Sequence, residues 1–306
     1  MISYKISYFR VVEIQRNALS SSDLRMEVQL GDNCSLLIEV EIRSTMRDLK
    51  LLQEESGLGL NNYPCTLCDS SKDEIRDPEK IRQGFVINRT SDALHSAGHY
   101  ARTNPQNLTR EQLGAVLKGS KGVPVTLGNS AVVNYSFESL HFKLSIARWL
   151  KGIIARVNSG IYVWSIDQTL RKTYQPYEEH LNTQLAKVLG IQRRLQMEGN
   201  EASKILSTEN IQDVVSLVTN IGQQQNMQFL ITELAYLNLV IQSQLPKKDY
   251  SMVEFSTRAK NLQLFLLEKF SWCQWPDYLH LGLAHTVQIL ATTDSISKYS
   301  GITEPI

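Results

Sequence analysis

Four side chains that can bind a metal ion occur in this sequence as two closely spaced pairs. Cys65 and Cys68 form a Cys-x-x-Cys pair, and His280 and His285 form a pair with four residues between them. Both spacings fit the halves of a structural zinc site, in which two thiolates and two imidazoles surround one Zn²⁺ ion as a tetrahedron. Because 211 residues separate Cys68 from His280, a shared ion would connect the beginning of the helical part of the chain to its end.

Other uses of Cys and His remain open when the residues are considered alone. A Cys-x-x-Cys pair also suits core packing or a redox pair, although a thioredoxin-like redox site requires a βαβ pattern that this sequence lacks. The His pair also suits buried polar groups in a helix rich in Tyr and Leu. Cys273 is a rival ligand, whereas Cys34 is expected to be a small buried apolar residue. His95 and His99 are four residues apart and could bind a metal from one helical face, but we expect them to lie on a loop surface.

The composition is that of a globular chain with a substantial core. The 306 residues are 42% apolar and 21% charged, and at about 150 residues per domain this length favours about two domains. The 32 Lys and Arg residues balance 31 Asp and Glu residues, so net charge indicates no acidic partner. The first ten residues lack an apolar leader and no apolar run reaches about 18 residues, so we expect neither secretion nor a membrane partner. The Cys residues are therefore expected to be reduced thiols.

Alternating apolar and polar residues near the start of the chain predict a small β-unit. The alternating apolar residues are Met26, Val28 and Leu30 in one run and Ile38, Val40 and Ile42 in the next. Gly31, Asp32 and Asn33 lie between the runs and are turn formers, so we expect an antiparallel pair. Residues 4–8 suggest an earlier strand of the same sheet.

Beyond the β-unit, apolar residues recur at steps of three and four, which predicts helices. The predicted helices span residues 137–157, 170–188, 211–221, 227–241 and 255–270. Pro246 separates the last two, and residues 69–134 are expected to mix short helices with loops. The predicted fold class is therefore α+β and predominantly helical.

Basic side chains are concentrated in residues 141–210. This region contains ten Lys and Arg residues and six Asp and Glu residues. Such a surplus suits contact with a phosphate backbone, and it is equally typical of a solvated helix face. We therefore treat this region as a candidate DNA-binding surface.

Several of these motifs resemble the catalytic core of the V(D)J recombination-activating protein and its Transib transposase relatives. Residues 63–69 (YPCTLCD) are similar to the family's cysteine motif, and residues 277–285 (DYLHLGLAH) are similar to its histidine motif. Weaker matches occur in the family's order at residues 139–141, 184–187 and 197–204. The resemblance extends over nearly the whole chain.

The resemblance implies that a helical insertion, held by one Zn²⁺ at Cys65, Cys68, His280 and His285, interrupts an RNase H-like nuclease domain. We accordingly expect four regions. Residues 1–57 form a remnant of the RNase H-like β-unit, and residues 58–140 form the Cys-containing zinc-binding region. Residues 141–292 form the helical His-containing zinc-binding region, and residues 293–306 are a truncated terminal helix region of the nuclease fold.

The same resemblance demands three carboxylates that this sequence does not supply intact. Nucleases of this kind use two Asp and one Glu to hold two divalent ions about 4 Å apart. Met46 stands at the position of the second Asp, where the nearest acid is Asp48, and the third position falls near Ile302. Asp48 and Glu304 are the displaced candidates. A shift of two residues along a strand moves a carboxylate by about 6–7 Å, so we expect this chain not to cleave DNA. We expect Mg²⁺ or Mn²⁺ to bind only if the chain is catalytic.

The leading hypothesis is a transposase-derived nuclear protein that binds DNA, a related recombinase subunit or a second copy of itself, without cutting DNA. An alternative is an active or partner-completed endonuclease or strand transferase. A further alternative is a zinc-stapled helical module that binds proteins.

Overall fold

The computed structural model describes backbone and side chains at residues 62–89, 139–191, 195–243 and 251–291. It describes backbone alone at 25–31, 34–39, 45–47, 135–137 and 292, and isolated positions at 96, 99, 100, 103, 109, 112, 116–118 and 296. Contacts divide the chain into two compact units. The first comprises Met1–Lys72 with Ile87–Ser136, and the second comprises Asp73–Val86 with Phe137–Ile306.

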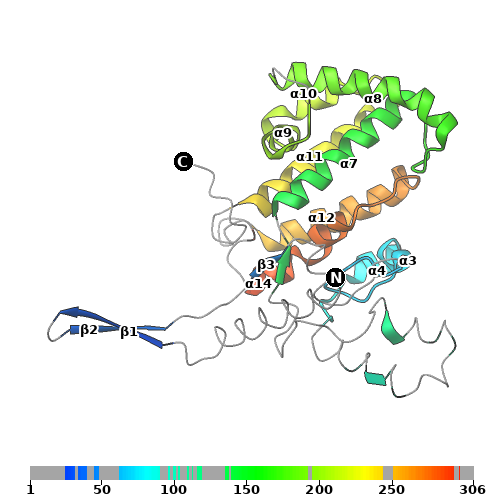
Figure 1. Cartoon of the computed structure of the whole chain (residues 1–306). Helices are drawn as coiled ribbons and strands as arrows, with labels where there is room; N and C mark the ends of the chain where they lie inside the picture. The colour runs from blue at the N-terminus through cyan, green and yellow to red at the C-terminus, as the bar shows by residue number, and fades with distance from the viewer. Residues whose placement is uncertain are drawn as a thin grey trace, which may run out of the picture. The chain divides into compact units, whose positions relative to one another are not determined.

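The first unit contains the predicted antiparallel strand pair. Strand β1 spans Arg25–Gly31 and strand β2 spans Cys34–Glu39, and the two pair antiparallel with Met26 opposite Ile38 and Val28 opposite Leu36 (Figure 1). This pairing confirms the predicted antiparallel strand pair, with a shift in register between Gln29 and Gly31. Strand β3, Thr45–Arg47, pairs with β4, Tyr135–Phe137. The predicted strand at residues 4–8 and the ends of the second run at Val40 and Ile42 lie outside the described residues.

Two short helices precede the helical body. Helix α3 spans Lys72–Ile75 and helix α4 spans Pro78–Gln83. Asp77 caps α4 by accepting a hydrogen bond from the backbone N–H of Glu79, and Pro78 occupies the first helical position, where its missing N–H is not needed. Gly84 ends the helix with φ of +89°, a conformation that favours glycine.

The core of the second unit is built around α7, Ser139–Ser159, which Figure 1 shows among α8, α9 (Gly199–Ile205) and α11 (Gln224–Gln242). Helix α7 also packs on α13, Asp277–His280. The buried stripe of α7 follows the predicted spacing and includes Phe142, Ile146, Leu150, Ile153 and Ile154, each at most 1% exposed. Helix α8 spans Gln168–Val188 and begins at Asp167, whose carboxylate accepts the N–H groups of Thr169 and Leu170.

The remaining helices extend to the end of the described chain. They are α9 Gly199–Ile205, η2 Thr208–Asn210, α10 Ile211–Ser216, η3 Ile221–Gln223, α11 Gln224–Gln242, α12 Met252–Lys269, α13 Asp277–His280, the π-helical turn η5 Leu281–His285, and α14 Thr286–Thr292. Helices α7, α8, α11 and α12 confirm four of the five predicted helices to within a few residues. The residue that separates α11 from α12 in the prediction, Pro246, lies outside the described residues.

The fifth predicted helix, residues 211–221, is wrong in its second half. Helix α10 ends at Ser216, and the side chain of Asn158 then donates to the carbonyl of Leu217 and accepts the N–H of Thr219, at 2.8 and 2.9 Å. These hydrogen bonds to α7 offer the backbone an alternative to continuing the helix. The apolar periodicity could not reveal a partner that lies 59 residues earlier in the chain.

From residue 62 onward, the described part of the chain is predominantly helical, as predicted. A search of these described residues finds no helix with the length and apolar character needed to cross a membrane. The four predicted regions, with boundaries at residues 57, 140 and 292, stay predictions.

Candidate metal centre

The cysteine pair lies on a tight loop of the first unit. Cys65 and Cys68 are each 1% exposed, and the Cys65 Sγ accepts the backbone N–H groups of Leu67 and Cys68 at 3.3 and 3.4 Å. N–H groups directed at one sulfur stabilise a thiolate, the form of Cys that binds metal ions. The loop therefore orients both Cys residues as a metal-binding knuckle, which we define as residues 65–68.

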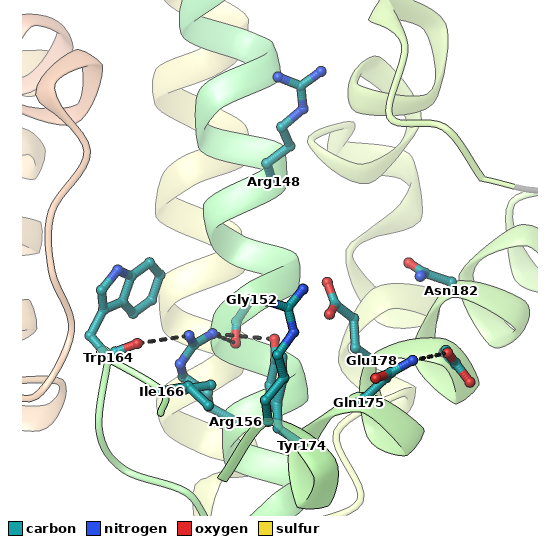
Figure 2. A pocket seen from close by; sticks show the side chains of 11 residues that line it. Arg148, Gly152, Arg156, Trp164, Ile166, Tyr174, Gln175, Glu178 and Asn182 are labelled. Atoms are coloured by element: carbon teal, nitrogen blue, oxygen red, sulfur yellow. Dashed lines mark hydrogen bonds between the residues drawn. The ribbon is translucent and has the colours of Figure 1, made fainter. Parts of the chain in front are cut away.

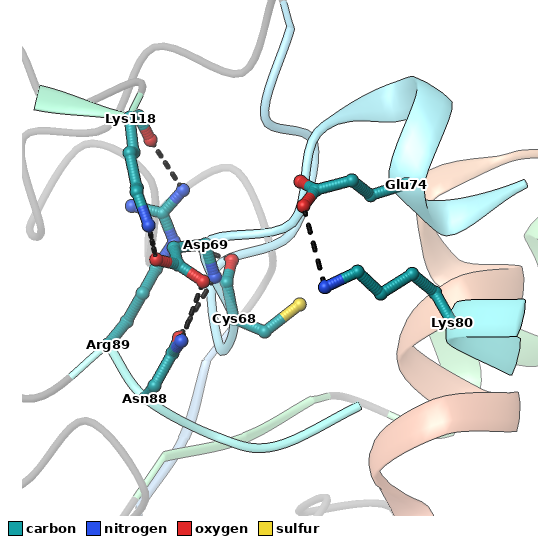
Figure 3. Close-up of polar contacts among 7 residues, drawn as sticks. All are labelled: Cys68, Asp69, Glu74, Lys80, Asn88, Arg89 and Lys118. Carbon is teal, nitrogen blue, oxygen red and sulfur yellow. Dashed lines mark hydrogen bonds and ion pairs between the residues drawn. The ribbon is translucent and has the colours of Figure 1, made fainter. Parts of the chain in front are cut away.

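A buried arginine stabilises the backbone of the knuckle. Arg89 is 3% exposed, and its guanidinium donates to the carbonyl oxygens of Cys68 and Lys118, both at 2.7 Å (Figure 3). The N–H groups of Asn88 and Arg89 both donate to the Leu67 carbonyl at 3.1 Å. Burial lowers the pKa of Arg89, while the nearby Cys65 and Cys68 thiols oppose that decrease. Arg89 therefore brings a positive charge beside the two sulfurs.

Asp69 belongs to the same hydrogen-bond network and lies where this network reaches solvent. Its carboxylate accepts a hydrogen bond from the Asn88 amide at 2.6 Å and pairs with the Lys118 ammonium, as Figure 3 shows. Burial raises the pKa of Asp69, but the hydrogen bonds from Lys118 and Asn88 outweigh burial and leave the pKa below its usual value. The Asp69 carboxylate is thus held in its charged form beside Arg89.

The histidine pair lies in the second unit, where one helical segment runs from α13 through η5 into α14. His280 is 2% exposed and His285 is fully buried, and their ring centroids are 5.2 Å apart at an interplanar angle of 90°. In an α-helix, residues five apart point about 140° away from each other, because each residue turns the helix by about 100°. The segment Leu281–His285 is instead wound as a π-helix, which has more residues per turn than an α-helix. This winding brings both imidazoles to one side.

The nitrogens of His285 give an observation that favours a metal ion. Among the described residues, neither Nδ1 nor Nε2 of His285 has a hydrogen-bond partner, although both atoms are buried. A buried polar atom without a partner is destabilising by about 1–3 kcal/mol. A metal ion bound to one of the two nitrogens would remove the penalty at that nitrogen.

The two pairs present a complete set of zinc donors. One ligand atom from each of Cys65, Cys68, His280 and His285 lies within 4.8 Å of the others, and all four residues are buried. The ligand atoms of a tetrahedral zinc site lie about 3.3–3.8 Å from one another, given Zn–S and Zn–N bonds of about 2.3 and 2.0 Å. The residues present therefore fit Zn²⁺ in number, type and burial.

The Cys65 thiol needs a nearby positive charge of this kind to ionise. Burial raises the pKa of the Cys65 thiol well above its ordinary value, and the adjacent Cys68 thiol raises it further. A bound dication reverses this preference, because it stabilises the thiolate directly. The buried Cys65 thiol thus stays protonated without a metal and can become a thiolate ligand when a dication binds.

The other candidate ligands lie elsewhere or outside the described residues. Cys273 is fully buried but is not part of the metal-binding cluster, and burial raises the pKa of its thiol to about 12. His99 is exposed, as expected, but it is helical and does not lie on a loop. His95, Asp48 and Glu304 lie outside the described residues, and the side chain of Cys34 is not described.

In the basic region 141–210, where Arg193 and Arg194 lie outside the described residues, several of the described charged side chains are buried. Lys143 and Arg156 are buried, and Lys143 donates to the hydroxyl of Ser203 at 2.7 Å. Lys151 is partly buried and contacts Asn182 and Glu178. The exposed, described Lys and Arg residues of the region are Arg148, Arg171, Lys172, Lys187 and Lys204, and the exposed acids are Asp167, Glu179, Glu198 and Glu209. The surplus on the described surface is therefore one.

Arg156 serves a structural role at the base of a pocket of about 560 Å³ between α7 and α8. Its guanidinium lies over the rings of Trp164 and Tyr174, at 4.3 and 4.8 Å, as Figure 2 shows. It also donates to the carbonyls of Gly152, Val163 and Trp164. These contacts use most of its N–H groups, so Arg156 fixes the loop after α7 and has little left for a ligand.

Two features of the site could not be identified from the residue spacing. The π-helical turn is one, because a His-x₄-His spacing carries no sign of the local helix type. The supporting role of Arg89 is the other, because Arg89 is 21 residues from Cys68, the residue whose carbonyl it contacts. The only sequence signal for these features was Gly282 between the two His residues, because a glycine inside a helix can indicate close packing on a neighbouring element.

Comparison with known proteins supports the metal centre in both halves of the chain. Residues 63–127 match the model of the recombination-activation protein 1 (RAG1) ZnC2 domain, and residues 135–294 match that of the RAG1 ZnH2 domain. The first of these matches contains the knuckle and the second contains the His pair.

Curated relatives agree with the domain matches. The chain is 24% identical to V(D)J recombination-activating protein 1 of Oncorhynchus mykiss, over 94% of this chain and 26% of that protein. It is also 24% identical to the protein of the same name from Oryctolagus cuniculus, over 94% of this chain and 27% of that protein. The chain thus spans about a quarter of the length of these relatives. Since the ZnH2 match alone covers more than half of the 306 residues, the chain belongs to the recombination-activation protein 1 (RAG1) family.

Proposed function

We propose that Cys65, Cys68, His280 and His285 together bind one structural Zn²⁺ ion. The observation that carries this proposal is the grouping of four buried donors whose ligand atoms lie within 4.8 Å of one another. Four protein ligands complete the tetrahedron, so no position is left for water or substrate, as in structural rather than catalytic zinc sites. The ion would supply folding free energy and no chemistry.

Metal analysis of the purified full chain tests this site. We expect one zinc per chain, and we expect Co²⁺ substitution to give the intense visible absorption of a tetrahedral S₂N₂ site. Cys68→Ser and His285→Ala should each lose the metal, whereas Cys273→Ser, which alters a buried Cys outside the cluster, should retain it. A metal-free wild-type chain, or a Cys68→Ser variant that still contains one zinc, would contradict the site.

We propose further that the chain is a recombinase-derived DNA-binding protein that does not cut DNA by itself. Support comes from its membership of the RAG1 family and from the loss of a carboxylate at Met46, a residue of β3. A thioether does not coordinate Mg²⁺, which requires oxygen ligands. In this proposal β1, β2 and β3 are remnants of an RNase H-like β-unit, and the chain acts in the nucleus with DNA, a second copy or a related recombinase subunit.

A nicking assay on supercoiled plasmid tests the loss of cleavage. We expect no nicking by the full chain with either Mg²⁺ or Mn²⁺. Metal-dependent nicking that is abolished by Asp48→Ala or Glu304→Ala would overturn this proposal and establish the alternative, an active DDE-type nuclease.

DNA affinity as a function of salt tests the binding proposal. The exposed Lys172 and Lys187 of α8 are candidates for phosphate contact, and each such contact contributes about −0.9 to the slope of log K against log salt. Replacing both by Ala should reduce the slope by about 2, whereas Lys269→Ala, an exposed site on α12, should leave it unchanged. Absence of DNA binding at low salt, with protein partners retained after nuclease treatment, would instead support the interaction module.

A further inference from the structure

The helix that contains both His ligands changes its winding at the point where they lie. Helix α13 ends at His280, the π-helical turn spans Leu281–His285, and α14 begins at Thr286. Single π-helical turns are rare because they are less stable than α-helix, and they persist where surrounding structure holds them. Two residues of the chain have contacts that can hold this turn in place.

The first is Gly282, which lies against the ring of Phe142 from α7. A Cβ atom at position 282 would stand 2.3 Å from Cε2, 3.0 Å from Cδ2 and 3.1 Å from Cζ of Phe142. Phe142 is 1% exposed, so its ring has no solvent side to move into. Only glycine allows this approach of the turn to α7, and any larger residue must push the turn outward or displace the ring.

The second is Thr286, which follows His285 and is fully buried. Its hydroxyl donates to the Gly282 carbonyl at 2.7 Å. Where the winding of a helix changes, backbone carbonyls lose their regular partners, and a side chain that supplies a hydrogen bond stabilises the irregular turn. The hydroxyl thus ties the beginning of the turn to its end.

The ring of His280 has a contact that depends on the same turn. The ring centroids of Phe85 and His280 lie 4.8 Å apart at an interplanar angle of 86°. Because His285 is perpendicular to His280 at 5.2 Å, small changes in the turn alter the direction of both imidazoles. A zinc ion tolerates little deviation from tetrahedral geometry in a structural site.

We propose that Gly282 and Thr286 are positioning residues for the metal centre, because they hold the π-helical turn that makes residues 280 and 285 converge. This inference rests on the proposed zinc site. Gly282 acts through close packing on Phe142, and Thr286 acts through its hydroxyl. An α-helical segment of the same sequence would direct the two imidazoles to different sides.

Zinc competition with a chromogenic chelator, on the full chain, tests Gly282. We expect Gly282→Ala to lower zinc affinity by about tenfold or more, the range in which loss of supporting residues acts. Phe142→Leu removes Cε2, the ring atom nearest the new Cβ, and Cζ, the third nearest. The double variant Phe142→Leu with Gly282→Ala should therefore regain affinity relative to Gly282→Ala. Gly222→Ala is the matched control, because its nearest neighbour would be Asn220 Oδ1 at 3.5 Å, an ordinary contact.

The Thr286 contact is tested by a pair of substitutions. Thr286→Val keeps the shape but removes the hydroxyl, and it should weaken zinc binding and shift the Co²⁺ absorption spectrum. Thr286→Ser keeps the hydroxyl and should retain the wild-type spectrum and affinity. Equal affinity and identical spectra for the Val and Ser variants would overturn the role of Thr286.

Thermal unfolding of the chelator-treated proteins separates this inference from the zinc site itself. If wild-type protein contains no zinc, the zinc site fails, but the packing of the turn is still measured by the metal-free double-mutant cycle of Phe142→Leu and Gly282→Ala. We expect Gly282→Ala to lower the unfolding midpoint by several degrees and the second substitution to recover part of that shift. A folded Gly282→Ala variant with wild-type midpoint and wild-type zinc affinity would overturn the inference.

Discussion

The two halves of the metal centre are positioned by different forces. The knuckle at residues 65–68 is held by polar contacts: Arg89 donates to the Cys68 carbonyl, and the Leu67 carbonyl accepts two backbone N–H groups. The His pair is held by close packing, because Gly282 contacts Phe142 and the edge of Phe85 meets the ring of His280. One half depends on a buried charge and the other on shape.

This difference follows from the backbone that each pair occupies. A loop leaves its carbonyl and N–H groups without regular partners, so a buried loop must obtain them from side chains such as Arg89. A helix satisfies its own backbone groups, so the direction of its side chains is decided by winding and by the surface it packs on. Substitutions should therefore act on the knuckle through hydrogen bonds and on the His pair mainly through volume, apart from the Thr286 hydroxyl, which donates to the Gly282 carbonyl.

The largest effect of this kind is expected for Arg89→Met. This change leaves the carbonyls of Cys68 and Lys118 without their donor, which should lower the free energy of unfolding by about 3 kcal/mol. Arg89→Lys should recover little, because one ammonium cannot reproduce the forked geometry of a guanidinium. Urea denaturation measures both, with Arg82→Met as the exposed control. Equal stability of the Arg89 and Arg82 variants would mean that polar support of the knuckle is unimportant.

A smaller effect is expected for Phe85→Leu in the packed half. The variant loses the edge contact with His280 and part of a buried ring, and it should destabilise the protein by about 1–2 kcal/mol. The adjacent residue provides the control, since Val86 is 70% exposed and Val86→Ala should change stability little. The same denaturation series gives the result, and its dependence on salt should be negligible. A strong salt dependence would contradict apolar support of the His pair.

A weaker polar effect is expected where the knuckle network reaches solvent. Lys118→Met removes the ion pair with Asp69. The side chains of Lys118 and Asp69 are 47% and 29% exposed, so the free energy of unfolding should decrease by only about 0.5 kcal/mol. This decrease should become smaller at high salt. Asp69→Asn should behave alike. Unfolding curves at low and high salt provide the measurement, and a loss comparable to that of Arg89→Met would place the main support of the knuckle at its surface instead.

The smallest effect at neutral pH concerns Cys273, a buried Cys outside both halves. Its pKa in the folded state is raised to about 12 by burial, so the folded state retains a proton that the unfolded state releases near pH 9. The stability contributed by this thiol is therefore present below about pH 9 and is lost as pH rises toward 12. Comparing Cys273→Ala with wild type above pH 9 should show a flatter decline for the variant. Parallel declines would contradict the raised pKa.

Local sequence patterns predicted much of this protein, each for an identifiable reason. The alternation around Met26 and Ile38 predicted the β1–β2 hairpin, because side-chain direction in a strand depends only on position. The apolar stripe of residues 137–157 predicted α7 in the same way. Helix α10 was predicted too long because Asn158, on another helix, supplies the hydrogen bonds that end it.

The candidate ligands were also accessible from sequence, since Cys-x-x-Cys and His-x₄-His spacings reflect the chemistry of one ion. What the sequence by itself determined is therefore the type of donor, the hairpin and most helix positions, all of which depend on residues a few positions apart. Only the tertiary structure decided the winding of the helix between His280 and His285 and the support of the knuckle by Arg89. Both depend on residues distant in the chain, Phe142 and Lys118 among them, and on burial that removes water as an alternative partner.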